Sequence, residues 1–158
     1  MFENTIKVLN KFGELLVKEY KQSLVDNNVN TSKKTLYNSV TYLVENNNNT
    51  FEVKIELEDY WKYVENGRKA GEYVEFDTIK NWIKIKPIIP RPFRNGYLPT
   101  INHLTQLIQD KIYLKGIEPR PLFKQSLDKV FDEMSIELEN AVIEDCSHII
   151  NVELLKIP

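Results

Sequence analysis

The clearest pattern along the chain is a strict alternation of apolar and charged residues at positions 51 to 58. The apolar members are Phe51, Val53, Ile55 and Leu57. This period of two predicts a β-strand with one buried face and one face in water. The preceding residues 40–44 are rich in β-formers, and the asparagines at 46–49 can supply the positive φ angles of a tight connection. We therefore predict an antiparallel hairpin over residues 39–58.

Apolar residues at helical spacing indicate a long helix near each end of the chain. Within residues 3–25 they stand at multiples of three, four and seven positions: Ile6, Leu9, Leu16, Tyr20 and Leu24. This spacing predicts an amphipathic helix that ends at Asp26. A second apolar seam predicts a helix from about Pro121 to about residue 146, and its members are Phe123, Leu127, Val130, Met134, Leu138 and Val142. The β-branched residues within 148–156 favour a short C-terminal strand beside the hairpin.

Between the hairpin and the final helix, the sequence predicts three shorter helices and one long loop. Residues 59–66 form the first helix. Asp77 can cap the second, whose apolar side consists of Ile79, Trp82 and Ile83. Residues 87–99 cannot continue that helix, because their four prolines fix φ and remove amide donors. Thr100 then opens the third helix, and Gly116 ends it.

Together these elements predict an α+β fold in a single domain, residues 1–158. A small antiparallel sheet is packed by the long N-terminal and C-terminal helices, and residues of about 77–116 form a helical and proline-rich insertion. A chain of 158 residues buries about two-thirds of its unfolded surface around one core. The single cysteine, Cys146, excludes an intrachain disulfide, and we expect it to be a small, half-buried residue.

The sequence indicates neither export nor membrane insertion. It does not begin with a basic segment followed by an apolar one, and no apolar run approaches the roughly 20 residues that cross a bilayer. We therefore expect a soluble protein that is not secreted and has no contact with membranes. The formal net charge of -2 is close to neutral and points to no particular partner.

Charge is strongly segregated along the chain. Residues 78–109 contain no acidic residue, and their five positive charges are Lys80, Lys84, Lys86, Arg91 and Arg94. Residues 130–155 contain no lysine or arginine, and their seven negative charges are Asp132, Glu133, Glu137, Glu139, Glu144, Asp145 and Glu153. Either the two blocks meet within one monomer or form separate solvated faces, or they let copies of the chain associate head to tail.

Residues that could carry catalysis are sparse. His103 and His148 form no recognisable zinc or iron pattern, and we expect neither metal nor cofactor. Glu52 and Lys54 stand two apart on the predicted strand, as do the acid and the lysine that hold a metal and a water in many nucleases. Alternating Glu and Lys is also the ordinary wet face of an amphipathic strand. We predict that the chain is not an enzyme, and a metal-dependent nucleic-acid-cleaving enzyme that uses these two residues is the alternative.

Aromatic residues gather just after the hairpin, at Tyr60, Trp61 and Tyr63, with Arg68 and Lys69 close behind. Such a group can stack bases of a single strand. Aromatics within one helical turn more often supply one anchor to the core and another to an interface. We favour the second interpretation.

Three short segments stand in an informative order along the chain. Leu36-Tyr37-Asn38-Ser39 precedes the first predicted strand. Tyr63-Val64-Glu65-Asn66-Gly67-Arg68, with Gly71 after it, follows the second. Gly116-Ile117-Glu118-Pro119-Arg120-Pro121-Leu122-Phe123 introduces the terminal helix. In this order, over roughly residues 3–145, the chain resembles the head-to-tail connector and tail-completion, or neck, proteins of tailed bacteriophages. It departs from the simplest members in its longer insertion and in Asn66-Gly67, where other residues are common.

The resemblance implies a structural protein of the virion with an α+β fold. Such a subunit forms a homo-oligomeric ring in the neck or upper tail and is assembled in the host cytoplasm. Its neighbours would be portal, connector or tail proteins. DNA would pass through the ring without sequence-specific recognition.

We expect the subunit contacts to lie in the loops of residues 66–75 and 87–99, because both are long, aromatic and charged. The expected contact residues are Tyr63, Glu65, Arg68, Lys69, Arg91, Phe93, Arg94 and Tyr97. A small monomeric protein that interacts with a host factor is a further alternative.

Overall fold

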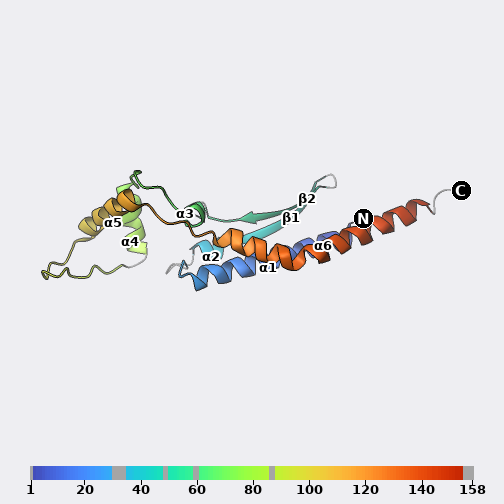
Figure 1. Ribbon diagram of the computed structural model, residues 1–158, viewed down its shortest axis with the longest axis horizontal. Helices are drawn as coiled ribbons and strands as arrows, with labels where there is room; N and C mark the ends of the chain where they lie inside the picture. The colour runs from blue at the N-terminus through green and yellow to red at the C-terminus, as the bar shows by residue number, and fades with distance from the viewer. Residues whose placement is uncertain (1, 30–34, 48–49, 59–60, 86–87, 155–158) are drawn as a thin grey trace.

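The protein is an elongated molecule in which two long helices run antiparallel, a β-hairpin lies along them, and a small helical lobe stands at one end (Figure 1). The computed structural model describes residues 2–29, 35–47, 50–58, 61–85 and 88–154. Its helices are α1 (Glu3–Asp26), α2 (Thr35–Ser39), α3 (Trp61–Asn66), α4 (Phe76–Ile85), α5 (Ile101–Lys115) and α6 (Leu122–Leu154). Its strands are β1 (Thr41–Asn47) and β2 (Thr50–Glu56). The predicted α+β fold, with a long helix at each end, is confirmed.

The strands β1 and β2 pair antiparallel, as the alternation predicts. Tyr42 lies opposite Ile55 and Val44 opposite Val53, and these four side chains are half-buried. The hairpin contacts α1, where Gly13 leaves room for the ring of Tyr42, because a Cβ at position 13 would overlap that ring. A glycine within a helix costs roughly 0.5–1 kcal/mol relative to alanine, but here it lets the sheet approach the helix closely. We expected the asparagines at 46–49 to connect the strands, but Asn46 and Asn47 belong to β1, where they pair with Phe51 and Thr50. Residues 48 and 49 lie outside the described residues.

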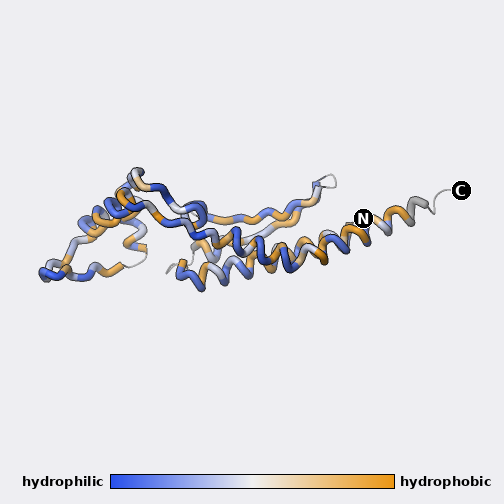
Figure 2. Tube along the Cα trace, viewed as in Figure 1, coloured by the Kyte–Doolittle hydropathy of each residue, from blue (hydrophilic) through white to orange (hydrophobic). Residues whose placement is uncertain are grey.

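The core is a seam between α1 and α6 that extends to the start of the hairpin. One cluster consists of Val8, Leu16, Val130, Met134 and Ala141. A second consists of Tyr20, Leu24, Leu36, Val40 and Leu122. Figure 2 shows apolar residues recurring along both long helices. These clusters confirm most of the predicted apolar stripes, although Val142 at the end of the second stripe is exposed.

The helices α4 and α5 pack on each other and form the lobe, which projects away from the two long helices (Figure 1). The side chains of Ile79 and Ile83 are buried, as predicted, whereas Trp82 is exposed. The hydroxyl of Thr100 accepts a hydrogen bond from the amide of His103 at 3.2 Å, which confirms the predicted cap. The prediction that Asp77 caps α4 is wrong. That helix begins at Phe76, so Asp77 lies in its first turn, where a negative charge still favours the helix N-terminus.

The C-terminal strand predicted for residues 148–156 is also wrong, because α6 continues through Leu154. Residues 155–158 lie outside the described part. Isoleucine and valine prefer strands only weakly, and the unbroken helical spacing of the preceding residues overrides that preference. Cys146, expected to be half-buried, is exposed on the same helix. The short helix α2 was not predicted, and its Leu36 is buried in the second core cluster.

None of the helices in the described ranges combines the length and the apolar character that crossing a bilayer requires.

Candidate assembly surfaces

Two glycine-containing segments, residues 63–71 and 116–123, lie side by side, although the whole lobe separates them in the sequence. The amide of Arg68 donates to the carbonyl of Ile117 at 2.9 Å, and the amide of Ile117 donates back at 2.8 Å. The amide of Arg120 donates to the carbonyl of Val64 at 2.9 Å. These bonds form a junction that closes the base of the lobe and connects it to the long helices.

Glu65 caps the N-terminus of α6 at this junction. One carboxylate oxygen accepts from the amide of Phe123 at 2.9 Å, and the other accepts from the amide of Lys124 at 2.9 Å. The first amides of a helix have no partner within the helix, and a carboxylate there also interacts favourably with the helix dipole. Glu65, predicted from the sequence as a partner contact, therefore stabilises the fold of its own subunit.

The glycines of the two segments are needed because the backbones approach closely. Gly67 and Gly116 have φ angles of 64° and 71°. A Cβ at position 67 would overlap the carbonyl of Ile117, and a Cβ at position 116 would overlap the carbonyl of Arg68. The glycine-marked pattern thus specifies the junction itself.

Arg68 lies half-buried beside the junction. Its Nη2 donates to the carbonyl of Tyr73 at 3.2 Å and lies 3.8 Å from the carboxylate of Glu72. Its guanidinium stands 5.8 Å from the ring centroid of Tyr63. Within the described ranges its Nε is buried without a hydrogen-bond partner. The carboxylate of Glu65 is bound to the amides of α6, so the guanidinium of Arg68 lies beside Glu72 instead.

Two of the predicted contact residues near the junction are open to solvent. The side chain of Tyr63 is 55% exposed, and Lys69 is exposed as well. Trp61, by contrast, is half-buried, with its ring 5.7 Å from that of Phe123. The aromatic group therefore supplies one core anchor, as we favoured from the sequence, and one exposed ring, whose part in an interface stays a prediction. Tyr60 lies outside the described residues.

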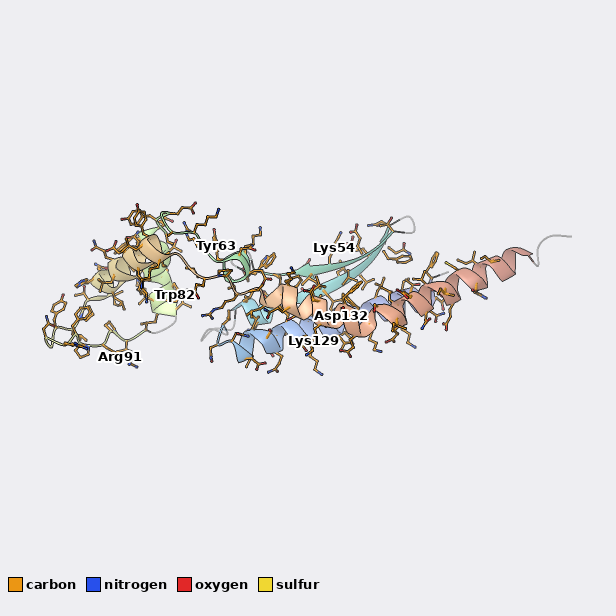
Figure 3. The ribbon with its side chains drawn as sticks, in the orientation of Figure 1. Lys54, Tyr63, Trp82, Arg91, Lys129 and Asp132 are labelled. Carbon is orange, nitrogen blue, oxygen red and sulfur yellow. The ribbon has the colours of Figure 1, made fainter. Side chains whose placement is uncertain are left out.

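The described residues of the basic block lie in the lobe. Lys80 and Lys84 belong to α4, and Arg91 and Arg94 belong to the loop that joins α4 to α5. Figure 3 shows Arg91 far out on this loop, well away from Asp132 of α6. Both arginines are exposed. Lys86 lies outside the described residues.

Residues 93–97 of this loop form a tight turn that contains two aromatic rings. The amide of Phe93 donates to the carbonyl of Tyr97 at 2.9 Å, and the amide of Gly96 donates to the carbonyl of Phe93 at 2.9 Å. The rings of Phe93 and Tyr97 stack with centroids 6.1 Å apart, and that of His103 lies 5.7 Å from Tyr97. The structure thus brings together Arg91, Phe93, Arg94 and Tyr97, the four contact residues that the sequence predicts for this loop. They lie far from the other predicted contacts at the junction.

The acidic block of the sequence lies on α6, and part of it is used within the molecule. Asp145 accepts hydrogen bonds from the amide and hydroxyl of Thr5, at 2.8 Å and 2.7 Å. Glu137 pairs with Lys11 at 2.7 Å across the helix seam. Asp132 and Glu139 are exposed and take part in no ion pair within the described ranges. Among the members of the two blocks that the structure describes, no ion pair joins a basic residue to an acidic one within the monomer. This disfavours one of the interpretations left open by the sequence.

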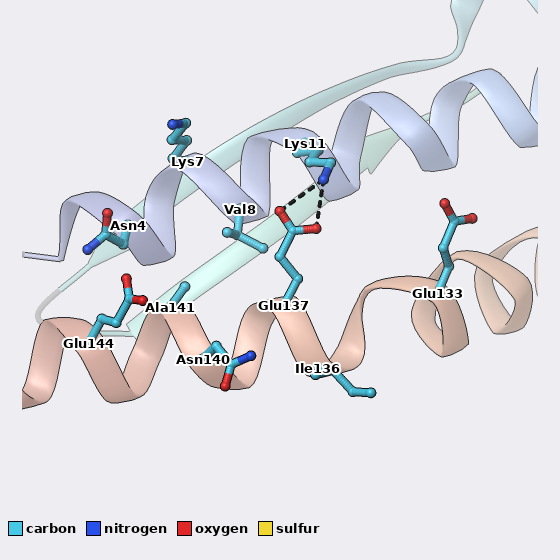
Figure 4. Close-up of a pocket in the computed structure, with 10 residues that line it drawn as sticks. All are labelled: Asn4, Lys7, Val8, Lys11, Glu133, Ile136, Glu137, Asn140, Ala141 and Glu144. Atoms are coloured by element: carbon cyan, nitrogen blue, oxygen red, sulfur yellow. Dashed lines mark hydrogen bonds and ion pairs between the residues drawn. The ribbon is translucent and has the colours of Figure 1, made fainter.

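A groove of about 560 Å³ with a mixed polar and apolar lining lies between α1 and α6. Figure 4 shows Val8 and Ala141 between the two helices, with Lys11 and Glu137 joined beside them further along the seam. Ile136 points away from α1 (Figure 4). The groove is open and carries both charges, so it has the character of a surface between packed helices.

A row of exposed isoleucines along α6 was missed by the sequence prediction. Ile136, Ile143 and Ile150 follow one another at intervals of seven, and their side chains are 70%, 61% and 59% exposed. Positions seven apart lie on nearly the same side of a helix. We call these three residues the isoleucine ridge. The spacing is visible in the sequence, but assigning Ile150 to a strand obscured it.

The nuclease alternative concerns the wet face of the hairpin. There Lys54 pairs with Glu45 and lies 3.8 Å from Glu52. The hydrogen bond from Lys54 lowers the pKa of Glu45, and the same bond raises the pKa of Lys54. No group of three or more potential metal ligands occurs in the part of the chain that the structure describes. This is the geometry of an exposed ion pair.

Comparison with protein-family models, with curated proteins and with solved structures finds no match for this chain.

Proposed function

We propose that the chain is a ring-forming structural subunit of the neck or upper tail of a tailed-phage particle. The observation that carries this proposal is the separation of charge along the molecule, with the basic lobe at one end and acidic residues on α6 beyond it (Figures 1 and 3). Copies with two unlike ends attract one another head to tail. Such heterologous contacts close into a ring when the rotation per subunit divides a full turn.

The exposed loop of the lobe supports a role in binding. Ile89 is 83% exposed, and Phe93, Tyr97 and Leu98 are exposed beside Arg91 and Arg94. Apolar and aromatic side chains supply affinity when they are buried at an interface, while charges set orientation. A loop of this composition is costly to leave in water, which favours a partner surface.

The junction between the lobe and the long helices supports the proposal. Glu65, Gly67 and Gly116 hold the lobe at a defined angle to the long helices through the contacts described above. A subunit that positions one binding surface relative to another needs a rigid connection between them. In the proposed ring, the neighbours are portal, connector or tail proteins, and DNA passes through the lumen without sequence readout.

The proposal is tested on purified virus particles from which adsorbed protein has been removed with high salt. We expect mass spectrometry to find the chain in the particles, in a fixed ratio to the portal protein. We expect electron microscopy of the same particles to place a ring of its size at the neck. A chain that is abundant in infected cells but absent from washed particles would overturn the proposal.

The alternative, a metal-dependent nuclease, makes a different prediction. It requires DNA or RNA cleavage with Mg²⁺ or Mn²⁺ that is lost in Glu52→Ala and Lys54→Ala but retained in Glu58→Ala, a change in a nearby exposed acid. We expect the wild-type protein to cleave no more than these variants do. Cleavage with the pattern just described would show that the chain is an enzyme and would overturn the proposal of a ring subunit.

A further inference from the structure

Helix α6 is apolar on two opposite sides. One side carries Val130, Met134 and Ala141, which are buried against α1. Two residues further along a helix correspond to a turn of roughly 200°. Ile136 therefore lies opposite Met134, and Ile143 lies opposite Ala141. A helix that served only the core of this monomer would carry polar residues there.

The isoleucine ridge has an acidic border. Asp132 precedes Ile136 by four positions and Glu139 precedes Ile143 by four, so each acid lies one turn from an isoleucine on the same side of the helix. Both acids are exposed and unpaired within the described ranges. Lys7 and Lys11 of α1 line the groove on the other border of α6, where Lys11 pairs with Glu137 (Figure 4). The ridge is thus an apolar row beside uncompensated negative charge.

The ridge is a poor match for a second copy of itself. Two ridges packed together would bring Asp132 and Glu139 of both copies close, and like charges in a partly desolvated contact repel. A suitable occupant combines exposed apolar side chains with positive charge. The loop of the lobe has both, in Ile89 and Phe93 together with Arg91 and Arg94.

The loop cannot reach the ridge of its own monomer. The lobe stands at one end of the molecule, and α6 runs from the junction toward the other end, past the N-terminus of α1 (Figure 1). Only a neighbouring copy can bring a loop onto this part of α6. Each copy would then give one loop and receive another.

We infer that the isoleucine ridge, bordered by Asp132 and Glu139, receives the basic loop of the next copy of this chain. The inference rests on the proposed ring and names the two surfaces that meet in it. Ile89 and Phe93 cover the isoleucines, and Arg91 and Arg94 pair with the acids at the border. The contact is heterologous, because the giving and receiving surfaces are different.

The test is a charge exchange between two full-length variants. In the first, Arg91→Glu and Arg94→Glu make the loop acidic while the ridge stays acidic. In the second, Asp132→Lys and Glu139→Lys make the border of the ridge basic while the loop stays basic. Each variant alone opposes like charges at the contact. Mixed together, the acidic loop of one meets the basic ridge of the other, and both kinds of contact are restored.

Native mass spectrometry and sedimentation velocity measure the result, with one variant carrying a mass tag. At a concentration at which the wild-type chain is mostly oligomeric, we expect each variant alone to be mostly monomeric, with a dissociation constant raised at least about tenfold. We expect the equal mixture to return to oligomers in which the two variants alternate. Glu52→Lys with Glu58→Lys is the matched control, because it reverses two exposed acids of the hairpin region that belong to neither proposed surface. This control should assemble as the wild type does.

Three results would overturn the inference. The mixture could remain as dispersed as its components, a single variant could assemble like the wild type, or the wild-type chain could stay monomeric at every concentration. Each of these differs from failure of the proposed function, which is decided by the presence of the chain in washed particles. A chain found in particles whose variants do not complement each other is a neck subunit with a different contact.

Discussion

Asp145, near the far end of α6, caps the N-terminus of α1 through Thr5. Its Oδ2 accepts from the amide of Thr5 at 2.8 Å and from the hydroxyl at 2.7 Å, while Oδ1 accepts from the amide of Asn4 at 3.3 Å. Phe2, at the N-cap position, provides no side-chain cap of its own. Two helices that begin and end far apart in the sequence are therefore joined by one buried carboxylate.

Replacing Asp145 by asparagine should lower the free energy of unfolding by about 1–2 kcal/mol at pH 7, the usual cost of losing a helix cap or a charged hydrogen bond. An amide keeps the size of the side chain but has one acceptor oxygen and no charge. Urea unfolding measures the loss. Glu144→Gln, an exposed neighbour on the same helix, is the control and should change the free energy of unfolding by much less. Equal losses in the two variants would mean that the cap contributes nothing specific.

The same cap makes stability depend on pH. Burial alone would raise the pKa of Asp145, but the hydrogen bonds from Thr5 and Asn4 together outweigh it and lower the pKa. A carboxyl group with a lowered pKa in the folded state stabilises the protein above its unfolded pKa of about 3.9, and this contribution is lost as the pH falls through the folded value. The difference in the free energy of unfolding between the wild type and Asp145→Asn should therefore be largest near pH 7. It should shrink as the pH falls below about 4. A difference that stays constant down to pH 2 would contradict this account.

Glu65→Gln should weaken the start of α6. The carboxylate that accepts from Phe123 and Lys124 becomes an amide with one acceptor, and we expect a loss of about 1 kcal/mol in the free energy of unfolding. Amide hydrogen exchange at positions 123 and 124 should accelerate, while exchange in the middle of α1 should follow only the global change. Glu72→Gln is the control, since Glu72 is exposed and caps no helix. Unchanged exchange at both amides would show that water replaces the cap without cost.

Gly116→Ala should destabilise the junction more than Gly96→Ala destabilises the loop. Both glycines have positive φ, at 71° and 80°, so each substitution carries backbone strain of roughly 1–3 kcal/mol. Only at position 116 would the new Cβ also meet backbone atoms, those of Arg68 to Ala70, whereas position 96 is open. Thermal unfolding of the two variants separates the cost of backbone strain from the cost of the overlap at position 116. Equal shifts in Tm would indicate that the junction yields easily and that strain alone matters.

Most of the fold was predictable because its determinants are local. The period-two alternation of residues 51–58, the apolar stripe of α1 and the cap at Thr100 each depend on neighbouring residues, and each was confirmed. The prediction of a C-terminal strand was wrong because it used local preferences alone. Ile149 and Ile150 prefer strands when taken alone, but the continuing helix places them in a register set by Met134 and Ala141, much earlier in the chain.

The roles of individual site residues were harder to predict, because they depend on contacts between distant segments. Nothing near Glu65 indicates that its carboxylate reaches the first amides of α6, and nothing near Asp145 indicates Thr5. Charge segregation was visible in the sequence, but its meaning depends on where the lobe stands. The isoleucine ridge could have been found from its interval of seven, which is typical of a helix with a second packed face.

The loop between α4 and α5 allows a direct test of whether assembly and folding depend on different parts of the chain. Replacing residues 89–97 by a Gly-Ser linker of equal length should leave the long helices and the hairpin intact, because the clusters that bury them contain no residue of this loop. Circular dichroism and the urea midpoint should therefore change little, and Pro99 and Thr100 remain to begin α5. Assembly measured by sedimentation should fall sharply, since the exposed apolar and basic side chains are removed together. A linker of the same composition in place of residues 69–72, at the tip of the junction loop, is a comparison at the other predicted contact. A loop variant that unfolds the body would show that the lobe stabilises the long helices, and one that assembles normally would move the subunit contact to another surface.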